Sequence, residues 1–350
     1  MILNNLPARY RTSPFAVLCA AWVGATGGSA HVVYQVRRDP NRRGEWFFSQ
    51  DAELNFPHTF LARKSWSTAR ATIYPLRPGL RFLARFRPTH IFAAGWDSPA
   101  SLACAAFARL TGARLVIWVE SNATTSLARR GATALIKRFV LGAAGAVVVP
   151  TRASYDLVVS ISQSEMDVAF LANPVALERM TDDGSDGRRI LFIGELSARK
   201  GFDVFMEACA LGAHAGWTGL AWGDDTEGLA AQAPANCRVA PARPLEVLIP
   251  DLRSADVWAI PSRRDPAPLT FSEALALGLR VTVSDAIAYS ELATSTLGAD
   301  VHGAEDPESL IASAERLISG SRPTDRSAAE VSEVYWADGI MRLLNKGVSA

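Results

Sequence analysis

The sequence predicts an α/β protein of two domains, each a doubly wound parallel sheet covered by helices. Three observations lead to this fold class. The chain has 350 residues, which exceeds the usual size of a single hydrophobic core. Strand-like runs rich in β-branched residues alternate with helical stretches, as parallel sheets with crossover helices require. A polar, glycine-containing segment near the middle, residues 173–189, breaks this alternation and marks a domain boundary.

The first domain is expected to span residues 1–172. It begins with a short strand over Met1–Asn4 and a loop over Asn5–Thr12. The start signal Ser13-Pro14 predicts a helix over Pro14–Ala25. Gly27-Gly28 is interpreted as a helix-to-strand turn, because His31–Val36 reads as the next strand. The later strands are expected at His90–Ala94, Leu115–Val119, Ala146–Val149 and Val168–Ala172, with helices over Pro99–Leu110 and Arg129–Leu141.

The second domain is expected over residues 190–326, after a linker at 173–189. Its strands are predicted at Ile190–Ile193, Gly219–Trp222, Val257–Ile260 and Val281–Ser284, with a helix over Phe202–Gly212. A helix over Pro307–Ser319 has a clear start, because Asp306 is a favourable N-cap and proline is favoured at the first helical position. The tail, residues 327–350, is predicted to hold one helix over Ser327–Leu344, with apolar residues Val331, Val334, Tyr335, Ile340 and Leu343.

The composition is that of an ordinary globular protein. The longest apolar run, Phe139–Pro150, contains two glycines and is shorter than the roughly 20 residues that span a bilayer. The N-terminus lacks the basic and apolar regions of a signal peptide, so a cytoplasmic protein is expected. The four cysteines form no CxxC pair and the five histidines show no ligand spacing, which predicts reduced thiols and no metal site.

Charge is divided unevenly along the chain. Residues 1–170 hold 20 Lys/Arg and 9 Asp/Glu, a net +11, whereas residues 171–350 hold 16 and 26, a net −10. Two interpretations stay open: a solvated basic surface, or a first domain that faces anionic lipid head groups or a lipid-diphosphate acceptor at the inner face of the cell membrane. The candidate cations are Arg9, Arg11, Arg37, Arg38, Arg42, Arg43, Arg129, Arg130, Lys137 and Arg138. Nucleic-acid binding is not expected, because the basic pairs lack interleaved aromatic residues.

The most informative segment runs from Trp258 to Glu291. A buried strand ends in Pro261-Ser262, a short loop carries Asp265, and Glu273 follows eight residues later at the start of a short helix. Ligands of open α/β sheets bind at such strand ends. A helix start also offers backbone N–H groups to a phosphate. Carboxylates that hold hydroxyls, beside amides that hold phosphate, suit a sugar nucleotide.

This segment resembles the acidic-x7-acidic signature of retaining GT-B glycosyltransferases, most closely glycosyltransferase family 4, the glycosyl transferases group 1. The family's usual form is Glu-x7-Glu, and this chain has Asp265-x7-Glu273 followed by Gly278 and Val281. The resemblance implies two Rossmann-like domains that face each other across a cleft, with the donor held mainly by the second. It also implies that the last helix crosses back to the first domain.

A second segment, Ile190–Gly201, is similar to the family's Gly-Arg-Leu-x(2–4)-Lys-Gly motif. Lys200 matches the lysine that, together with an arginine, neutralises the donor diphosphate in the family. Glu195 stands at the arginine position, so Arg199 is the candidate to replace that arginine. Gly194 ends the strand, where a ligand can approach the backbone closely. The alternative for Arg199 and Lys200 is a solvated loop pair.

The resemblance also assigns roles to the two carboxylates. It implies that Glu273 binds the ribose hydroxyls and that Asp265 contacts a hydroxyl of the donor sugar. Glu273 has a structural alternative, because Thr270-x-x-Glu273 is a capping box. The backbone N–H groups of Leu269 and Thr270 are expected to contact phosphate, and Ser262 is expected in the donor site. Lysine, arginine and helix amides together would stabilise the charge on the leaving diphosphate.

Three loops of the first domain follow strands and are candidates for the acceptor side. They are Arg9-Tyr10-Arg11, Gly95-Trp96-Asp97 and Glu120-Ser121-Asn122. Many family members carry a histidine near the end of the fourth or fifth strand, close to the transferred sugar. Here Glu120 or Ser121 stands at the comparable place, and Glu120 is counted with the catalytic candidates Asp265, Lys200 and Arg199. For Asp97, an Asx-type turn is the alternative to acceptor binding.

The resemblance implies an enzyme that transfers a hexosyl unit from a nucleotide-diphosphate sugar to a hydroxyl acceptor, with retention of the anomeric configuration. The acceptor would be a glycan, a lipid-linked molecule or a small molecule, and no metal or other cofactor is expected. One alternative is a different GT-B enzyme, such as a nucleotide-sugar epimerase. Another is a non-catalytic GT-B subunit that binds a partner enzyme, which Glu195 and Asp265 keep open because they depart from the family's residues.

Overall fold

The computed structural model describes residues 1–38, 49, 53–64, 66–67, 72–73, 77–126, 131–164, 166–180, 188–294 and 296–346. The chain forms two compact units: unit 1 comprises residues 1–176 and 333–350, and unit 2 comprises residues 177–332. Residues 181–187 of the expected linker, and the basic residues Arg42, Arg43, Arg129 and Arg130, lie outside the described residues. In the described part of the chain, no helix is long and apolar enough to cross a membrane.

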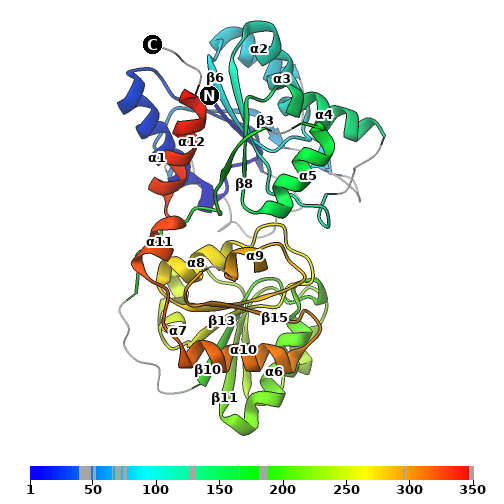
Figure 1. Cartoon of the computed structure of the whole chain (residues 1–350), viewed down its shortest axis with the longest axis vertical. Helices are drawn as coiled ribbons and strands as arrows, with labels where there is room; N and C mark the ends of the chain where they lie inside the picture. Colours follow the sequence, from blue (N-terminus) through cyan, green and yellow to red (C-terminus); the bar gives the residue numbers. More distant parts are fainter. Residues whose placement is uncertain are drawn as a thin grey trace. The chain divides into compact units, whose positions relative to one another are not determined.

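Unit 1 contains a seven-stranded sheet with the order β3-β2-β1-β6-β7-β8-β9, and all of its neighbouring strands are parallel (Figure 1). Its strands are β1 (Ile2–Asn4), β2 (Val32–Arg38), β3 (His58–Lys64), β6 (His90–Ala94), β7 (Arg114–Trp118), β8 (Ala146–Val149) and β9 (Asp167–Phe170). A separate antiparallel ribbon joins β4 (Trp66–Ser67) to β5 (Thr72–Ile73). Every residue of β8 is buried, which explains its unbroken Ala-Val-Val-Val run.

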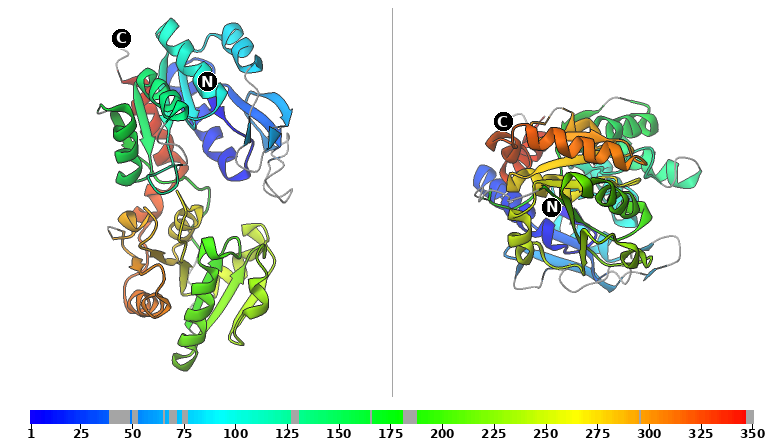
Figure 2. Two further views of the ribbon diagram at one scale, coloured as in Figure 1. Left: turned by 90° about the vertical axis from the view of Figure 1, so that its right-hand side faces the viewer. Right: turned by 90° about the horizontal axis from the view of Figure 1, so that it is seen from below.

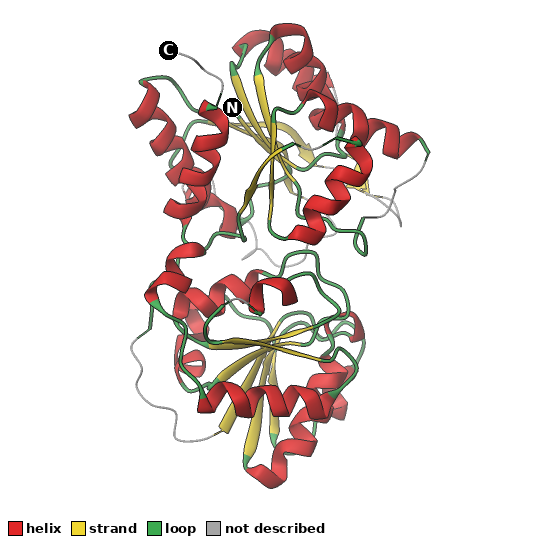
Figure 3. Ribbon diagram, viewed as in Figure 1, coloured by secondary structure: helices red, strands yellow, loops and turns green. Residues whose placement is uncertain are grey.

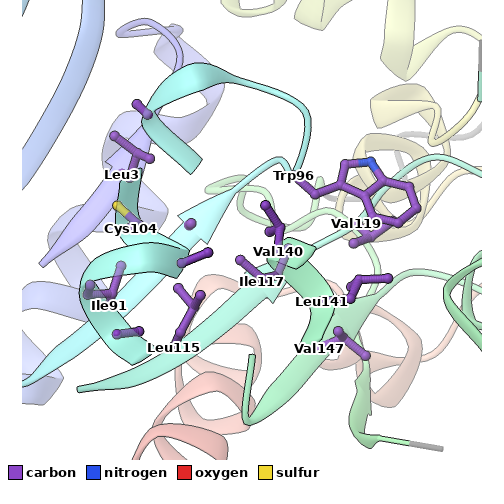
Figure 4. Close-up of a cluster of buried hydrophobic side chains, with 14 of the residues drawn as sticks. Leu3, Ile91, Trp96, Cys104, Leu115, Ile117, Val119, Val140, Leu141 and Val147 are labelled. Atoms are coloured by element: carbon purple, nitrogen blue, oxygen red, sulfur yellow. The ribbon is translucent and has the colours of Figure 1, made fainter. Parts of the chain in front are cut away.

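Helices cover both faces of the unit 1 sheet (Figure 3). They are α1 (Arg9–Thr26), α2 (Arg77–Phe86), α3 (Pro99–Thr111), α4 (Ala132–Ala143), α5 (Arg152–Ser162) and α12 (Glu333–Asn345). On one face α1 packs beside α12, where Trp336 contacts the rings of Phe15 and Trp118. On the other face a second core encloses Leu3, Ile91 and their neighbours (Figure 4).

The first helix starts earlier than the sequence predicts. It begins at Arg9 and contains Pro14, so the expected loop over Asn5–Thr12 is wrong beyond Ala8. Proline removes one helical hydrogen bond. The helix persists because Phe15 and Leu18 are buried against the sheet, and packing outweighs local propensity. The expected turn at Gly27 is confirmed, since this residue ends the helix with a φ of +65°.

Unit 2 contains a six-stranded parallel sheet with the order β12-β11-β10-β13-β14-β15. Its strands are β10 (Arg188–Ile193), β11 (Trp217–Trp222), β12 (Cys237–Ala240), β13 (Val257–Ile260), β14 (Arg280–Ser284) and β15 (Ala299–His302). Its helices are α6 (Phe202–Gly212), α7 (Ile249–Arg253), α8 (Leu269–Leu277), α9 (Ser290–Ala293), α10 (Pro307–Ser319) and α11 (Asp325–Glu330). Helices again cover both faces, with α6 and α10 on one side and α8 and α9 on the other (Figures 1 and 2). The expected N-cap Asp306 is confirmed, because its side chain accepts from the Ser309 N–H at 2.8 Å.

The tail forms two helices where one was predicted. The amides of Val331 and Ser332 donate to carbonyls three residues back, which ends α11 with a tightened turn. The chain then enters α12 and unit 1 at Glu333. Trp336, Ile340 and Leu344 are buried on this helix, whereas Val334 and Tyr335, which the sequence placed on its apolar face, are exposed.

Both sheets have one point at which the strand order reverses. In unit 1, β1 pairs with β6, although β2 and β3 lie between them in the chain. In unit 2, β10 pairs with β13 in the same way. Loops that leave the carboxyl ends of such neighbours diverge, and the crevice between them is where doubly wound sheets bind ligands.

Candidate functional site

In unit 2 the two motifs of the sequence meet at this reversal. Gly194 directly follows β10, and Pro261 directly follows β13. The short 3₁₀ turn Ala198–Lys200 ends at Gly201, the residue that opens α6. The carbonyl of Arg199 accepts the backbone N–H groups of Arg263 and Arg264 at 3.1 and 3.4 Å, so the turn is bonded directly to the loop after β13.

Glycine is required where these loops touch. A Cβ added to Gly201 would lie 1.9 Å from the carbonyl oxygen of Pro261, and the φ of Gly201 is +71°. A Cβ on Gly223 would lie 1.7 Å from the carbonyl oxygen of Gly194. Any other residue at these positions forces the backbone apart. The glycine of the Lys200-Gly201 pair thus places the lysine against the end of β13.

Replacing Gly201 with Ala should therefore destabilise unit 2. The methyl group meets a backbone carbonyl and the φ is unfavourable, so we expect a loss of about 2–4 kcal/mol in the free energy of unfolding. Urea unfolding followed by circular dichroism measures this loss. Gly228→Ala is the matched control, because Gly228 has a φ of +74° but no atom within 4 Å of the added Cβ. Equal losses in the two variants would contradict the close approach to Pro261.

Lys200 and Asp265 form an ion pair in the loops that follow β10 and β13, where the strand order reverses. The Lys200 Nζ donates to Oδ2 of Asp265. Asp265 is only 7% exposed, so its carboxylate is removed from water and depends on this ammonium. The structure thus brings together two catalytic candidates that lie 65 positions apart in the chain.

Arg199 is bonded to Glu195, the residue at the family's arginine position. Its Nη2 donates to Glu195 Oε2 at 2.9 Å, and its Nη1 donates to the carbonyl of Arg264 at 3.2 Å. The hydroxyl of Thr226 donates to Glu195 Oε1 at 3.2 Å. Desolvation opposes ionisation of Glu195, but the Arg199 guanidinium outweighs it and lowers the pKa of that carboxyl below its ordinary value. Both cations of the turn are thus paired with carboxylates.

Glu273 does not cap a helix. The N-cap of α8 is Pro268 and no side chain bonds the first turn, so the capping-box alternative for Glu273 is wrong. Thr270 is already the second helical residue, because Pro268, with its φ of −66° and ψ of 118°, starts the helix earlier. Glu273 has no hydrogen-bond or ion-pair partner among the described residues. Desolvation, with repulsion from Glu246 second, raises the pKa of Glu273 to about 7.

Two further donor candidates lie at the start of α8. Leu269 and Thr270 are its first residues, and their N–H groups have no acceptor within the helix. Ser262 is 2% exposed and lies in the loop between β13 and this helix. These positions agree with a phosphate approaching the helix start.

Arg11 and Glu120 meet at the reversal of the unit 1 sheet. Arg11 Nη2 donates to Glu120 Oε2 at 2.7 Å, and its Nη1 donates to Asn4 Oδ1 at 3.2 Å. The guanidinium lies 4.5 Å from the ring centroid of Trp118. Burial opposes the charge of Arg11, but Glu120 outweighs it and raises the pKa of Arg11 above its ordinary value. Arg11 therefore holds Glu120 in place at the strand end.

The other residues expected on the acceptor side are dispersed. Arg9 and Tyr10 lie with Arg11 on the first turn of α1 instead of on a loop, and Arg9 pairs with Glu53 at 2.7 Å. Asp97 is exposed and Ser121 is partly exposed, each beyond the carboxyl end of a strand. These two remain accessible at the edge where Glu120 lies.

Trp96 belongs to the core and not to an acceptor surface. It is 2% exposed and packs beside Val119 (Figure 4). The Nζ of Lys137 lies 4.7 Å from its ring centroid and donates to Ser126 Oγ at 3.0 Å. Burial lowers the pKa of Lys137, with Asp97 acting in the opposite direction. The expectation that Trp96 binds acceptor and that Lys137 lies on a basic surface is wrong, because a tertiary cation–π contact buries both.

Two residues of the crevices went unnoticed in the sequence. Asn4 joins Arg11 to the end of β1. Arg263 bonds Asp203, Glu305 and Ala198 in unit 2. A sequence signal existed only for Arg263, which stands between Ser262 and Asp265 within the acidic motif. No group of three or more His, Cys, Asp and Glu side chains in the described ranges could hold a metal ion.

The second unit matches a known family. Residues 187–320 match the model described as glycosyl transferases group 1. No curated protein sequence matches the chain. The matched range contains Glu195, Lys200, Asp265 and Glu273, so it includes the whole crevice of unit 2.

Solved structures resemble the chain along almost its whole length. The apo form of the lipopolysaccharide outer core galactosyltransferase WaaB has a TM-score of 0.69 at 11% identity, covering 98% of each chain. Anabaena HepE in complex with UDP has a TM-score of 0.66 at 13% identity, covering 99% of this chain and 97% of that one. Sucrose-phosphate synthase from Thermosynechococcus elongatus has a TM-score of 0.64 at 14% identity, covering 98% and 94%. The chain therefore has the fold of the GT-B glycosyltransferases, and residues 187–320 of its second unit match the family model of the glycosyl transferases group 1.

Proposed function

We propose that the protein is a retaining glycosyltransferase that moves a hexosyl unit from a nucleotide-diphosphate sugar to a hydroxyl acceptor. The observation that carries this proposal is the crevice of unit 2. It places Lys200, Asp265 and the start of α8 at one strand-order reversal, inside the range that matches the family model. Solved structures of HepE hold UDP and UDP-glucose, which supports a UDP-hexose as the first donor to test.

The donor is held by charge and by hydroxyl contacts. Lys200 and the N–H groups of Leu269 and Thr270 neutralise the diphosphate, and Arg199 adds its charge from the edge of the turn. Asp265 accepts a hydroxyl of the hexose. Glu273, which lacks a protein partner in the described chain, accepts the ribose hydroxyls. This assignment gives a role to both cations and both carboxylates of the donor side.

The transfer step needs little covalent chemistry from the protein. The bond between the anomeric carbon and the diphosphate oxygen breaks, and its electron pair stays on the diphosphate. The acceptor oxygen bonds to the same face of the carbon, and its proton passes to the leaving phosphate oxygen. Lys200 and the α8 amides stabilise the negative charge that develops on the leaving group. Glu120, fixed by Arg11, stays the candidate residue for the acceptor side within unit 1.

The test is release of nucleotide diphosphate by the purified protein. It is incubated with UDP-, GDP- and ADP-hexoses and a membrane extract, and the product is identified by mass spectrometry. Release that depends on one donor, that persists in EDTA and that leaves the anomeric configuration retained supports the proposal. Tight nucleotide binding without release from any donor would instead support a non-catalytic subunit. That alternative is favoured by one observation: Glu195 and Asp265 already pair the two cations of the donor turn.

We further propose that unit 1 docks on an anionic membrane that carries the acceptor. The helices α2, α3 and α4 expose large apolar residues, namely Phe86, Leu110, Leu135 and Ile136. Exposed arginines accompany them on the same helices and at their ends: Arg81, Arg85, Arg87, Arg109 and Arg138. Lys137, expected among the docking cations, is buried, and Arg11 is only partly exposed and paired with Glu120, so neither contributes.

Vesicle binding should weaken steeply with salt. Each arginine contributes about 1 kcal/mol at an anionic surface, screened beyond a Debye length of about 8 Å at physiological ionic strength. Sedimentation with phosphatidylserine-containing vesicles at low and physiological salt measures this. Leu135→Asp with Ile136→Asp should reduce binding at least tenfold, whereas Val247→Asp, at a 62% exposed position of unit 2, should not. A wild-type protein that stays in the supernatant at low salt would point to a soluble acceptor.

A further inference from the structure

The Arg263 side chain uses all of its hydrogen-bond donors. Its Nε and Nη2 donate to the two oxygens of Glu305 at 2.6 Å each. Its Nη1 and Nη2 donate to the two oxygens of Asp203 at 2.6 and 2.8 Å. The remaining donor of Nη1 is bonded to the carbonyl of Ala198. A guanidinium has five N–H groups in a fixed plane, and each of them has an acceptor here.

These contacts join three separate segments of unit 2. Ala198 opens the turn that carries Arg199 and Lys200, Asp203 lies in the first turn of α6, and Glu305 lies between β15 and α10. Arg263 itself lies in the loop that carries Asp265. Its backbone N–H also bonds the carbonyl of Arg199. One side chain thus fixes the turn of Lys200 to the loop of Asp265.

We propose that Arg263 is a positioning residue of the transfer reaction, which sets Lys200 against Asp265 so that both meet the donor. The inference rests on the proposed function. All side-chain donors of Arg263 are used by Asp203, Glu305 and the carbonyl of Ala198, so it acts through Lys200 and Asp265 and not on substrate. A turn that moved by one ångström would separate the ammonium from the diphosphate, and positioning errors of that size reduce rates strongly.

The positive charge of Arg263 stabilises the two carboxylates that it binds, which supports this positioning role. Desolvation raises the pKa of Asp203, but hydrogen bonds from Arg263 outweigh it and lower that pKa, and they also lower the pKa of Glu305. Without the guanidinium, the two neighbouring carboxylates would repel each other, and the carbonyl of Ala198 would keep only the N–H of Gly201 as a donor. Lysine cannot replace Arg263, because its ammonium has three donors and no planar fork that matches two carboxylates.

The first experiment measures how accessible the Lys200 amine is, and it needs no assay of transfer. Acetic anhydride labels free amines, and mass spectrometry gives the rate at each lysine. In Arg263→Gln, acetylation of Lys200 should rise at least threefold, because its pair with Asp265 loosens, while Lys346 in unit 1 serves as the internal reference. Arg316→Gln is the matched control, since Arg316 also bonds one carboxylate, Asp300, through Nε and Nη2 at 2.9 and 2.8 Å. An unchanged Lys200 rate in Arg263→Gln would overturn the inference, whatever the protein catalyses.

The second experiment measures the rate of sugar transfer. Arg263→Lys should lower kcat at least tenfold, with a melting temperature close to that of Arg316→Lys. Methylguanidinium added to Arg263→Ala should restore part of the lost rate, and it should not stimulate Arg316→Ala. Full transfer by Arg263→Lys would overturn the positioning role. A wild-type protein that transfers no sugar, in which Lys200 labelling still responds to Arg263→Gln, would overturn the proposed function and keep the coupling of the two loops.

Discussion

Replacing Lys200 with Met should weaken binding of the nucleotide diphosphate at least tenfold and reduce transfer by more. Lys200 makes a charge-assisted contact to the leaving group in our proposal, and such contacts contribute about 1.5–3 kcal/mol. At about 1.4 kcal/mol for each factor of ten, affinity should fall between roughly tenfold and one hundredfold. Transfer should fall further, because charge grows on the diphosphate in the transition state. Calorimetry with UDP and initial rates with the active donor measure the two losses.

The ion pair with Asp265 adds a stability effect that must be separated from binding. Lys200→Met leaves the carboxylate of Asp265 without its ammonium at a position that is 7% exposed. Removing one partner of a buried ion pair destabilises a protein, because the other charge stays buried without a partner. The double variant Lys200→Met with Asp265→Asn removes the unpaired charge, so it should regain stability without regaining affinity. Asp265→Asn alone should keep or tighten UDP binding and lose transfer, because it frees Lys200 but weakens the sugar contact. Unaltered UDP affinity in both lysine variants would remove Lys200 from the donor site.

Much of the fold could be predicted because local signals agree with the tertiary structure. The bounds of β6, β8, β13, α6 and α10 match the prediction residue for residue. These elements combine buried β-branched runs or regular helical periodicity with clear boundaries, such as Asp306 before Pro307 and the glycine at 201. The start of α1 could not be predicted, because a proline in its interior reads locally as a helix start and only packing on the sheet overrides it.

The candidate site was only partly visible in the sequence, because its energetics depend on distant contacts. The motif predicted that Lys200 and Asp265 both serve the donor, but their mutual ion pair joins residues 65 positions apart. Arg263 binds carboxylates 60 and 42 positions away, which no local pattern indicates. Trp96 and Lys137 looked like surface residues until their cation–π contact placed both in the core. Residue types and spacing predict which loops matter, whereas pairing and burial decide what each side chain in them does.

Glu273→Gln should separate a ligand-binding carboxylate from a structural one through pH. Desolvation raises the pKa of Glu273 from 4.5 to about 7, with Glu246 adding repulsion. The folded protein therefore binds a proton more tightly at this position than the unfolded chain does. Its contribution to stability is present at low pH and is lost as the pH rises from about 4.5 to about 7. The loss amounts to about 1–3 kcal/mol above pH 7, allowing for the partial exposure of the side chain.

Gln does not ionise, so the Glu273→Gln variant should be as stable as the wild type at pH 5. At pH 8 its free energy of unfolding should exceed that of the wild type by about 1–3 kcal/mol. Urea unfolding at the two pH values measures the difference, and Glu207→Gln, an exposed carboxylate on α6, is the matched control. Transfer should move in the opposite direction, falling at least tenfold at pH 8, because the neutral amide loses a charge-assisted bond to the ribose hydroxyls. The Glu273 carboxylate would then destabilise the ligand-free protein and yet be needed for transfer. A ligand that supplies its missing hydrogen-bond partners explains both effects. Full transfer in the Gln variant would leave the stability loss caused by the Glu273 carboxylate without a functional reason, and it would remove Glu273 from the donor site.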